Sequence, residues 1–349
     1  MDALRKLKGN FGKSHEAQQK IEFAPNPNTN PNNYTISSFE IKRTLGTGSF
    51  GRVHLVKLKG SEDYFAMKVL KKSEVMRLKQ DVHTVNERDV LSVATHPFLI
   101  KMEATMQDSM HLYFILEYVL GGELFSILRK ARRFPNHVAK FYAAEVVLAI
   151  EYLHSMDVVY RDLKPENILI AKDGHIKITD FGFAKYVPDN ITWTLCGTPD
   201  YLAPEIIQSR GYGKPADWYA LGILIFEMLC GFPPFYNEDH VKIYEGILAG
   251  KIVFPSSMDS NAKDIIKSLI SFDISKRLGN LKNGVADIKK HPWFKGVDWT
   301  KLAKKQITPP YVPPFKGYGD TSYFDRYPEE NNQYGIQTFD PFQEKFANF

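Results

Sequence analysis

The chain of 349 residues is 44% hydrophobic, so it can bury a sizeable core, and its length favours two packed lobes over one small unit. Its 45 lysine and arginine residues exceed its 40 aspartate and glutamate residues by five, a scattered surplus too small to indicate nucleic-acid binding. No apolar run approaches the roughly 18 residues of a membrane span, and the amino end lacks the apolar core of a signal peptide, so neither is expected.

The cysteine content bears on the compartment. Cys196 and Cys230 are too few for a disulfide framework, which favours a reducing environment. We therefore expect a cytoplasmic protein, with the nucleus as a further candidate location. Cys196 is interpreted as a small buried apolar residue, with redox sensitivity as the alternative.

Residues 1–38 comprise a basic amino-terminal segment and a linker, PNPNTNPNN at 25–33, which is not expected to pack a core. Alternating apolar residues then predict antiparallel strands near 39–41, 53–55 and 64–70, with a turn at 59–63. Helices are predicted near 81–93, 123–131, 137–156, 215–230 and 260–271, and short strands near 111–118 and 168–180. From about residue 296 the composition predicts an irregular tail that lies over the folded part.

The stretch Leu45-Gly-Thr-Gly-Ser-Phe-Gly51 contains the pattern G-x-G-x-x-G, which two unrelated architectures use to bind nucleotide phosphates. In a dinucleotide-binding unit a helix follows the third glycine, whereas here the alternating residues 52–56 predict a strand. The glycines are therefore expected in a hairpin that can offer backbone N–H groups to phosphates. A purely structural hairpin fits the loop equally well when the loop is taken alone.

Three downstream motifs occur in the order of the protein kinase signature. They are Tyr160-Arg-Asp-Leu-Lys-Pro-Glu-Asn167, Asp180-Phe-Gly182 and Ala203-Pro-Glu205. Within the kinases, Trp193-Thr-Leu-Cys-Gly-Thr-Pro199 and the end Phe346-Ala-Asn-Phe349 resemble the catalytic subunits of cyclic-AMP-dependent protein kinases, a family of the AGC group. Asp200 and the tail stretch Tyr327-Pro-Glu-Glu330 are similar to the fungal forms.

The resemblance covers the chain from Phe39 to its carboxyl end and implies an α+β, bilobal protein kinase fold. A small lobe at 39–116 would hold an antiparallel sheet and one key helix, and a hinge at 117–122 would lead to a mainly helical large lobe at 123–294. An AGC-type tail at 295–349 would wrap both lobes.

The resemblance also implies a serine/threonine kinase that uses ATP and two magnesium ions, because residues 162–167 match the Asp-x-Lys-x-x-Asn loop of that class. Phosphoryl transfer depends on positioning and on neutralising charge. Asp162 would orient the substrate hydroxyl and Lys164 would steady the moving phosphate. The magnesium ions would be bound by Asn167 and Asp180, whose side chains offer hard oxygen ligands.

In the nucleotide site, Lys68 would hold the α- and β-phosphates, and Glu87 on the following helix would fix its reach. Adenine would bond to the backbone of Glu117 and Val119. The full set that the resemblance assigns to ATP also includes Leu45, Gly46, Thr47, Gly48, Ser49, Phe50, Gly51, Val53, Ala66, Leu169 and, from the tail, Phe324.

For the protein substrate, Glu123, Glu166 and Glu227 are implied to bind arginines ahead of the phosphorylated residue, because a carboxylate can receive a guanidinium group bidentately. The spacing of these three glutamates in the sequence is equally consistent with three solvent-exposed acids that bind nothing. The apolar pocket for the residue after the acceptor would be formed by Leu195, Pro199 and Leu202. The expected substrates are thus basic sequences of the type Arg-Arg-x-Ser/Thr-apolar.

Regulation is expected at two places. Thr194 lies where activation segments carry a phosphate, and the resemblance gives it the cationic partners Arg161, Lys185 and His83. In the tail, a phosphorylation site is expected at Thr338, and a groove on the small lobe would receive Phe346 and Phe349. The implied partners are a cyclic-AMP-binding regulatory subunit and an upstream activating kinase.

Two alternatives stay open. A pseudokinase scaffold would keep the fold without transferring phosphate, although the presence of Lys68, Asp162 and Asp180 argues against it. An AGC kinase that cyclic AMP does not control fits the same residues.

Overall fold

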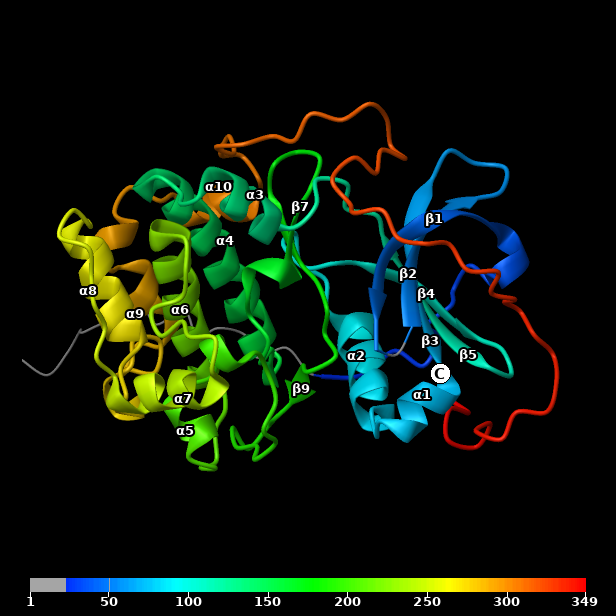
Figure 1. The fold of residues 1–349 in the computed structure, drawn as a ribbon, viewed down its shortest axis with the longest axis horizontal. Helices are drawn as coiled ribbons and strands as arrows, with labels where there is room; N and C mark the ends of the chain where they lie inside the picture. The colour runs from blue at the N-terminus through cyan, green and yellow to red at the C-terminus, as the bar shows by residue number, and fades with distance from the viewer. Residues whose placement is uncertain (1–22, 50) are drawn as a thin grey trace, which may run out of the picture.

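The computed structural model describes residues 23–49 and 51–349. Most of the expected basic amino-terminal segment, and Phe50 of the glycine-rich loop, lie outside the described residues. Figure 1 shows a twisted sheet with two helices on the right and a larger, mainly helical lobe on the left. The expected bilobal α+β fold is therefore confirmed.

The small lobe is built on a five-stranded antiparallel sheet of strand order β1-β2-β3-β5-β4. Its strands are β1 (Phe39–Gly48), β2 (Gly51–Leu58), β3 (Tyr64–Lys71), β4 (Met102–Gln107) and β5 (His111–Glu117). Strand β5 is buried at six successive positions, which explains its continuous apolar run. The lobe also contains the helices α1 (Lys72–Arg77) and α2 (Asp81–Val93), and the sequence analysis missed α1 and β4.

One face of the sheet is closed by segments from both ends of the described chain. Tyr34 and Ile36 from the amino-terminal segment, and Tyr334 from the tail, pack against the cluster that includes Val56 and Tyr113. The segment 25–33 forms no helix or strand, yet Thr105 of β4 donates its backbone N–H to the carbonyl of Thr29 over 2.8 Å. The proline- and asparagine-rich segment is thus fixed along the edge strand rather than separate from the lobe.

The large lobe surrounds α6 (Pro215–Cys230), which lies where a helix was predicted and is buried on nearly all sides. Gly231 ends α6 with φ +90°, and a Cβ there would come within 2.1 Å of the carbonyl oxygen of Arg132. The other helices are α3 (Leu124–Ala131), α4 (Asn136–Ser155), α5 (Pro204–Ile207), α7 (His240–Ala249), α8 (Ser260–Leu269), α9 (Val285–Lys289) and α10 (Trp299–Ala303).

Two short ribbons lie in the large lobe near the small one. Strand β6 (Val158–Val159) pairs with β9 (Lys185–Tyr186), and β7 (Ile168–Ile170) pairs with β8 (Ile176–Ile178). The strand expected near 168–180 is therefore two strands, because the chain turns back between Ala171 and His175.

The segment from residue 295 is not irregular from its start, because it contains the helix α10 up to Ala303. Beyond it the chain runs along one side of both lobes, drawn orange to red in Figure 1, and ends close to α1. Within the part of the chain that the structure describes, no helix is both long and apolar enough to cross a membrane.

Candidate active site

The glycine-rich loop joins β1 to β2 as an antiparallel hairpin, and Gly48 pairs with Gly51 across it. A Cβ on Gly51 would come within 1.7 Å of the carbonyl oxygen of Val69, so the close approach of β3 requires glycine there. A Cβ on Gly46 or Gly48 would meet no described heavy atom within 4 Å, so this backbone can approach a ligand closely. The structure thus contains the hairpin and not the strand-to-helix turn of a dinucleotide-binding unit.

Beneath the hairpin, Lys68 of β3 lies between two acids. Its Nζ is 2.7 Å from Oε1 of Glu87 on α2 and 3.6 Å from Oδ1 of Asp180. Burial would lower the pKa of Lys68, but the charges of Glu87 and Asp180 outweigh it and raise that pKa. The ammonium group is therefore held charged in a cavity of about 360 Å³ that the hairpin covers.

Asp162 lies at the centre of a second network. Its Oδ1 accepts from the hydroxyl of Thr198 at 3.0 Å, and its Oδ2 accepts from Nδ2 of Asn167 at 2.8 Å. Lys164 lies 2.9 Å from the same Oδ2 and donates to Thr198 over 2.9 Å. Burial raises the pKa of Asp162, although the charge of Lys164 lowers it, so the carboxylate is suited to accept a proton. The hydrogen bonds from Thr198 and Asn167 fix this carboxylate in place.

Asn167 and Asp180 fit a magnesium site that is completed by phosphate oxygens. Asn167 donates its Nδ2 to Asp162, which leaves its Oδ1 as the available ligand atom. The charge of Lys68 is the main cause of the lowered pKa of Asp180, so this carboxylate stays ionised. Residues 23–49 and 51–349 contain no group of three or more His, Cys, Asp or Glu side chains suited to a metal. Magnesium usually takes only one or two protein carboxylates together with phosphates, so the pair fits that ion.

An adjoining cavity of about 240 Å³ has an apolar lining suited to a flat ring. Phe324 reaches it from the tail, and its ring centroid lies 5.8 Å from that of Tyr118 in the hinge. Tyr118 donates its hydroxyl to the carbonyl of Asp320, which ties the tail to the hinge. The lining includes the expected residues Leu45, Gly46, Val53, Ala66, Lys68, Glu117, Val119, Leu169 and Phe324.

The three expected substrate carboxylates converge although they come from separate segments. Burial raises the pKa values of Glu123 and Glu227, and the charge of Glu166 raises each of them further. The charge of Asp325, which was not among the expected site residues, also raises the pKa of Glu123. No sequence pattern pointed to this tail carboxylate.

The expected apolar pocket is only partly formed. The backbone of Leu202 donates to the carbonyl of Pro199 over 3.3 Å, and Leu202 is buried. Leu195 is 69% exposed, so most of this residue faces solvent.

The cations expected around Thr194 come from separate segments, since His83 lies on α2, Arg161 directly precedes Asp162, and Lys185 lies on β9. Among the described residues their side chains form no hydrogen bond with Thr194, which is exposed. Arg161 donates to the carbonyl of Phe183 at 2.6 Å, and Lys185 donates to the hydroxyl of Thr192 at 3.2 Å. Burial lowers the pKa of His83, and the charges of Arg161 and Lys185 lower it further, so the three groups form one cluster in which the two cations favour the uncharged imidazole. Thr192 was missed as a partner of this cluster.

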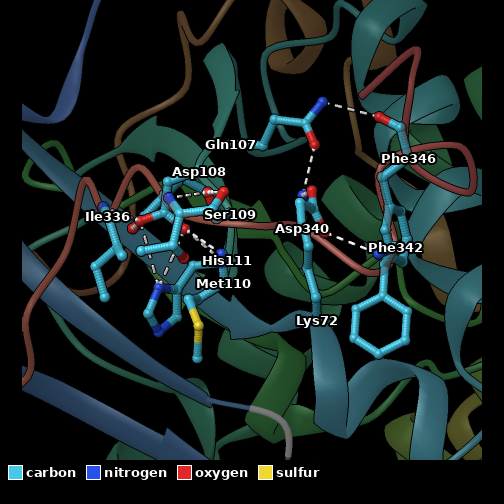
Figure 2. A network of polar contacts seen from close by, with 12 residues as sticks. Lys72, Gln107, Asp108, Ser109, Met110, His111, Ile336, Asp340, Phe342 and Phe346 are labelled. Atoms are coloured by element: carbon cyan, nitrogen blue, oxygen red, sulfur yellow. Dashed lines mark hydrogen bonds and ion pairs between the residues drawn. The ribbon is translucent and has the colours of Figure 1, made fainter.

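The tail ends on the small lobe through the polar contacts drawn in Figure 2. Phe346 is 1% exposed, and its carbonyl accepts from Nε2 of Gln107 over 2.8 Å. The ring of Phe349 packs edge-on against Phe114, with centroids 5.2 Å apart. Thr338 is exposed, and its backbone N–H and carbonyl both bond to the hydroxyl of Ser109.

Comparison with known proteins agrees with this geometry. The family model described as "Protein kinase domain" matches residues 39–294. A relative from Saccharomyces cerevisiae, "cAMP-dependent protein kinase type 3", is 57% identical over 90% of this chain and 79% of its own length. The "cAMP-dependent protein kinase catalytic subunit" of Arthrobotrys oligospora is 54% identical over 97% of this chain and 66% of its own length. The human "cAMP-dependent protein kinase catalytic subunit PRKX" is 56% identical over 85% of this chain and 83% of its own length.

The chain belongs to the protein kinase family, and it is a serine/threonine protein kinase. Within that family it is similar to the catalytic subunits of cyclic-AMP-dependent protein kinases, fungal ones among them.

Proposed function

We propose that this kinase transfers the γ-phosphate of ATP with two magnesium ions held by Asn167 and Asp180. The observation that carries the proposal is the ordered polar site: Lys68 lies against Glu87 and Asp180, and Asp162 is bonded to Asn167 and Thr198. Bound magnesium would neutralise charge on the phosphates.

The contacts of the chain's own groups support a role for each of them. Lys68 binds the α- and β-phosphates, because Glu87 keeps it charged and extended. Asp162 orients the substrate hydroxyl and accepts its proton, because Asn167 and Thr198 hold the carboxylate still. Lys164 offsets the charge that develops on the transferred phosphate.

For the substrate we infer basic sequences of the type Arg-Arg-x-Ser/Thr-apolar. The support is the group of buried or half-buried carboxylates, Glu123, Glu166 and Glu227, whose mutual repulsion a cationic peptide would relieve. We also propose a preference for an apolar residue after the acceptor, which the buried Leu202 beside Pro199 supports although Leu195 is exposed.

For regulation we propose a cyclic-AMP-binding subunit that occupies the substrate site until the nucleotide releases it. The support is the similarity to relatives whose printed names describe cyclic-AMP-dependent kinases. The competing candidate is an AGC kinase that cyclic AMP does not control.

The test uses the purified full chain, labelled ATP and the peptide Arg-Arg-Ala-Ser-Val, with Asp162→Asn as the inactive control. Phosphate transfer to serine supports the catalytic proposal, and its absence in the unchanged chain refutes it. Purification from the native cell tests the regulation: a co-purifying chain that binds cyclic AMP and leaves on its addition supports it. Activity that cyclic AMP never alters favours the uncontrolled kinase.

A further inference from the structure

A buried acid–base pair outside the active site touches the strands that lead to the metal ligands. Glu145 of α4 is 0% exposed and His175 is 2% exposed, so both side chains are shielded from water. Nδ1 of His175 lies 2.5 Å from Oε1 of Glu145, and the backbone N–H of Ile176 donates to Oε2 over 2.9 Å. Both carboxylate oxygens of Glu145 therefore bind consecutive residues of one strand end.

The strands concerned are β7 and β8, which we call the ribbon, residues 168–178. Asn167 directly precedes β7, and Asp180 follows β8 by two residues. The backbone N–H of Thr179 donates to the carbonyl of Asn167 over 2.9 Å, which closes the ribbon at that end. The two proposed metal ligands thus lie at one end of the ribbon, and Glu145 binds the other end. The two ends are about 10 Å apart, because each strand has three residues and rises about 3.3 Å per residue.

The ring of His175 links the ribbon to the loop after α2. It stacks on Phe98, with centroids 5.9 Å apart, and also contacts Phe141 of α4 at 5.8 Å. Ile178 donates its backbone N–H to the carbonyl of Phe98, and Ile100 donates to the carbonyl of Ile178, each over 2.8 Å. The pair therefore lies where α4, the ribbon and a small-lobe loop meet.

Stability alone is a weak reason for such a pair. Burying a charged group costs several kcal/mol, and apolar replacements of buried pairs are often neutral or stabilising. A directional contact to a strand end has a geometric effect that an apolar side chain cannot supply, because it fixes the strand along its own axis.

We propose that Glu145, together with His175, is a positioning residue for the metal ligands Asn167 and Asp180. It acts through the ribbon and does not touch nucleotide or metal. The inference rests on the proposed magnesium role of Asn167 and Asp180.

The test measures binding and not turnover. Affinity for a non-hydrolysable ATP analogue is determined by calorimetry, once with magnesium and once with a chelator, and the ratio gives the gain due to the metal. Glu145→Leu should reduce this ratio about tenfold, the low end of the effect of groups that support metal ligands. Glu145→Gln should keep the ratio of the unchanged chain, because an amide can still accept from Ile176 and bond to His175.

The control is Tyr142→Phe, one turn earlier on α4, which removes a buried hydroxyl that has no hydrogen-bond partner among the described residues. It should leave the ratio unchanged.

A Glu145→Leu chain with a lower melting temperature and a normal ratio would show that the pair is purely structural and would overturn the proposal. If that variant does not fold, His175→Phe keeps a ring beside Phe98 and removes only the Nδ1 contact. An unchanged ratio in His175→Phe would then overturn it.

A wrong assignment of the magnesium ligands would give a different result from a wrong positioning proposal. In that case the unchanged chain would gain no affinity for the ATP analogue from magnesium, or the Asp180→Ala chain would retain the gain.

Discussion

Arg129 donates from Nη2 to Oε1 of Glu227 over 2.9 Å, and the hydroxyl of Tyr201 donates to the other oxygen of the same carboxylate. One of the proposed substrate carboxylates is thus already bonded at both oxygens by the chain itself. Because Glu227 is 2% exposed, it needs such partners when no substrate is bound. An incoming arginine must share this carboxylate with Arg129 or replace it.

Glu227→Gln should therefore weaken selection for arginine. We expect kcat/KM for an Arg-Arg-x-Ser peptide to fall by a free-energy equivalent of about 2 to 5 kcal/mol, as for a buried charge pair that loses one partner. Peptides in which each arginine becomes alanine should respond much less to the change. Glu238→Gln, at an exposed glutamate, is the control. Equal losses on all peptides would place the arginine site elsewhere.

Lys68→Ala and Asp180→Ala should each abolish phosphate transfer and leave the fold intact. Each removes one charge from a site that works by neutralisation, and loss of a single such group commonly costs about 10²- to 10³-fold in kcat. Lys71→Ala, at an exposed lysine in the same strand, should transfer phosphate normally. Turnover within about tenfold of the unchanged chain, with circular dichroism confirming the fold, would contradict the assignment.

Thr194 should be phosphorylated mainly by a separate kinase. The four residues directly before it are Asn190, Ile191, Thr192 and Trp193, and none of these four is an arginine. The enzyme's own carboxylates would then face neutral groups, which makes the segment a poor substrate for itself. The measurement is the mass of the Thr194 peptide after expression in bacteria, with and without Asp162→Asn. Full phosphorylation in the active chain and none in the variant would mean that the kinase modifies itself.

The stability of the protein should fall in mild acid because of His96. Burial, assisted by the charge of Lys177, lowers the pKa of this histidine from 6.5 to about 4. Between pH 6.5 and about pH 4, the unfolded chain therefore binds a proton at His96 that the folded chain does not bind. The stabilisation is complete above the unfolded pKa and is lost as the pH falls towards 4. Between pH 7 and pH 5 the loss is roughly 1 to 2 kcal/mol.

His96→Phe tests this prediction, because it keeps a ring stacked on Tyr152 and cannot be protonated. The difference between its free energies of unfolding at the two pH values should shrink by that amount. His137→Phe, at an exposed histidine, should show the same pH dependence as the unchanged chain. An equal dependence in all three chains would exclude His96 as the cause.

Asp340→Ala should destabilise the small lobe. Figure 2 shows the carboxylate of Asp340 beside Lys72, whose side chain is 1% exposed and whose Nζ lies 2.5 Å from Oδ2 of Asp340. Removing one partner of a buried pair typically costs about 3 to 5 kcal/mol, because the remaining charge stays buried. The double variant Lys72→Met/Asp340→Leu should lose less. Urea unfolding measures both, with Glu344→Ala, at an exposed tail residue, as the control. A smaller loss of unfolding free energy in Asp340→Ala than in Lys72→Met/Asp340→Leu would contradict this prediction.

Several elements were predictable because their signals are local. The glycines at 46, 48 and 51 and the alternation that follows specify a hairpin. Local sequence patterns specified α2, α3, α4 and α8 within a few residues, and a nearly continuous apolar run specified α6. Helix α7 was not predicted, although Asp239 caps its start and Gly250 ends it. Helix α1 has six residues, and packing against the sheet stabilises it more than its own sequence does.

By itself the sequence determined the chemical groups of the site and their order, because motif residues such as Asp162, Lys164 and Asn167 are fixed relative to one another by a few peptide units. Only the tertiary structure decided which distant groups meet: Asp325 with Glu123, Arg129 with Glu227, and Glu145 with His175. Such pairs form when packing brings separate elements together. A single sequence carries no periodic signal for contacts across tens of residues, and burial, which sets the pKa values of these groups, exists only in the folded chain.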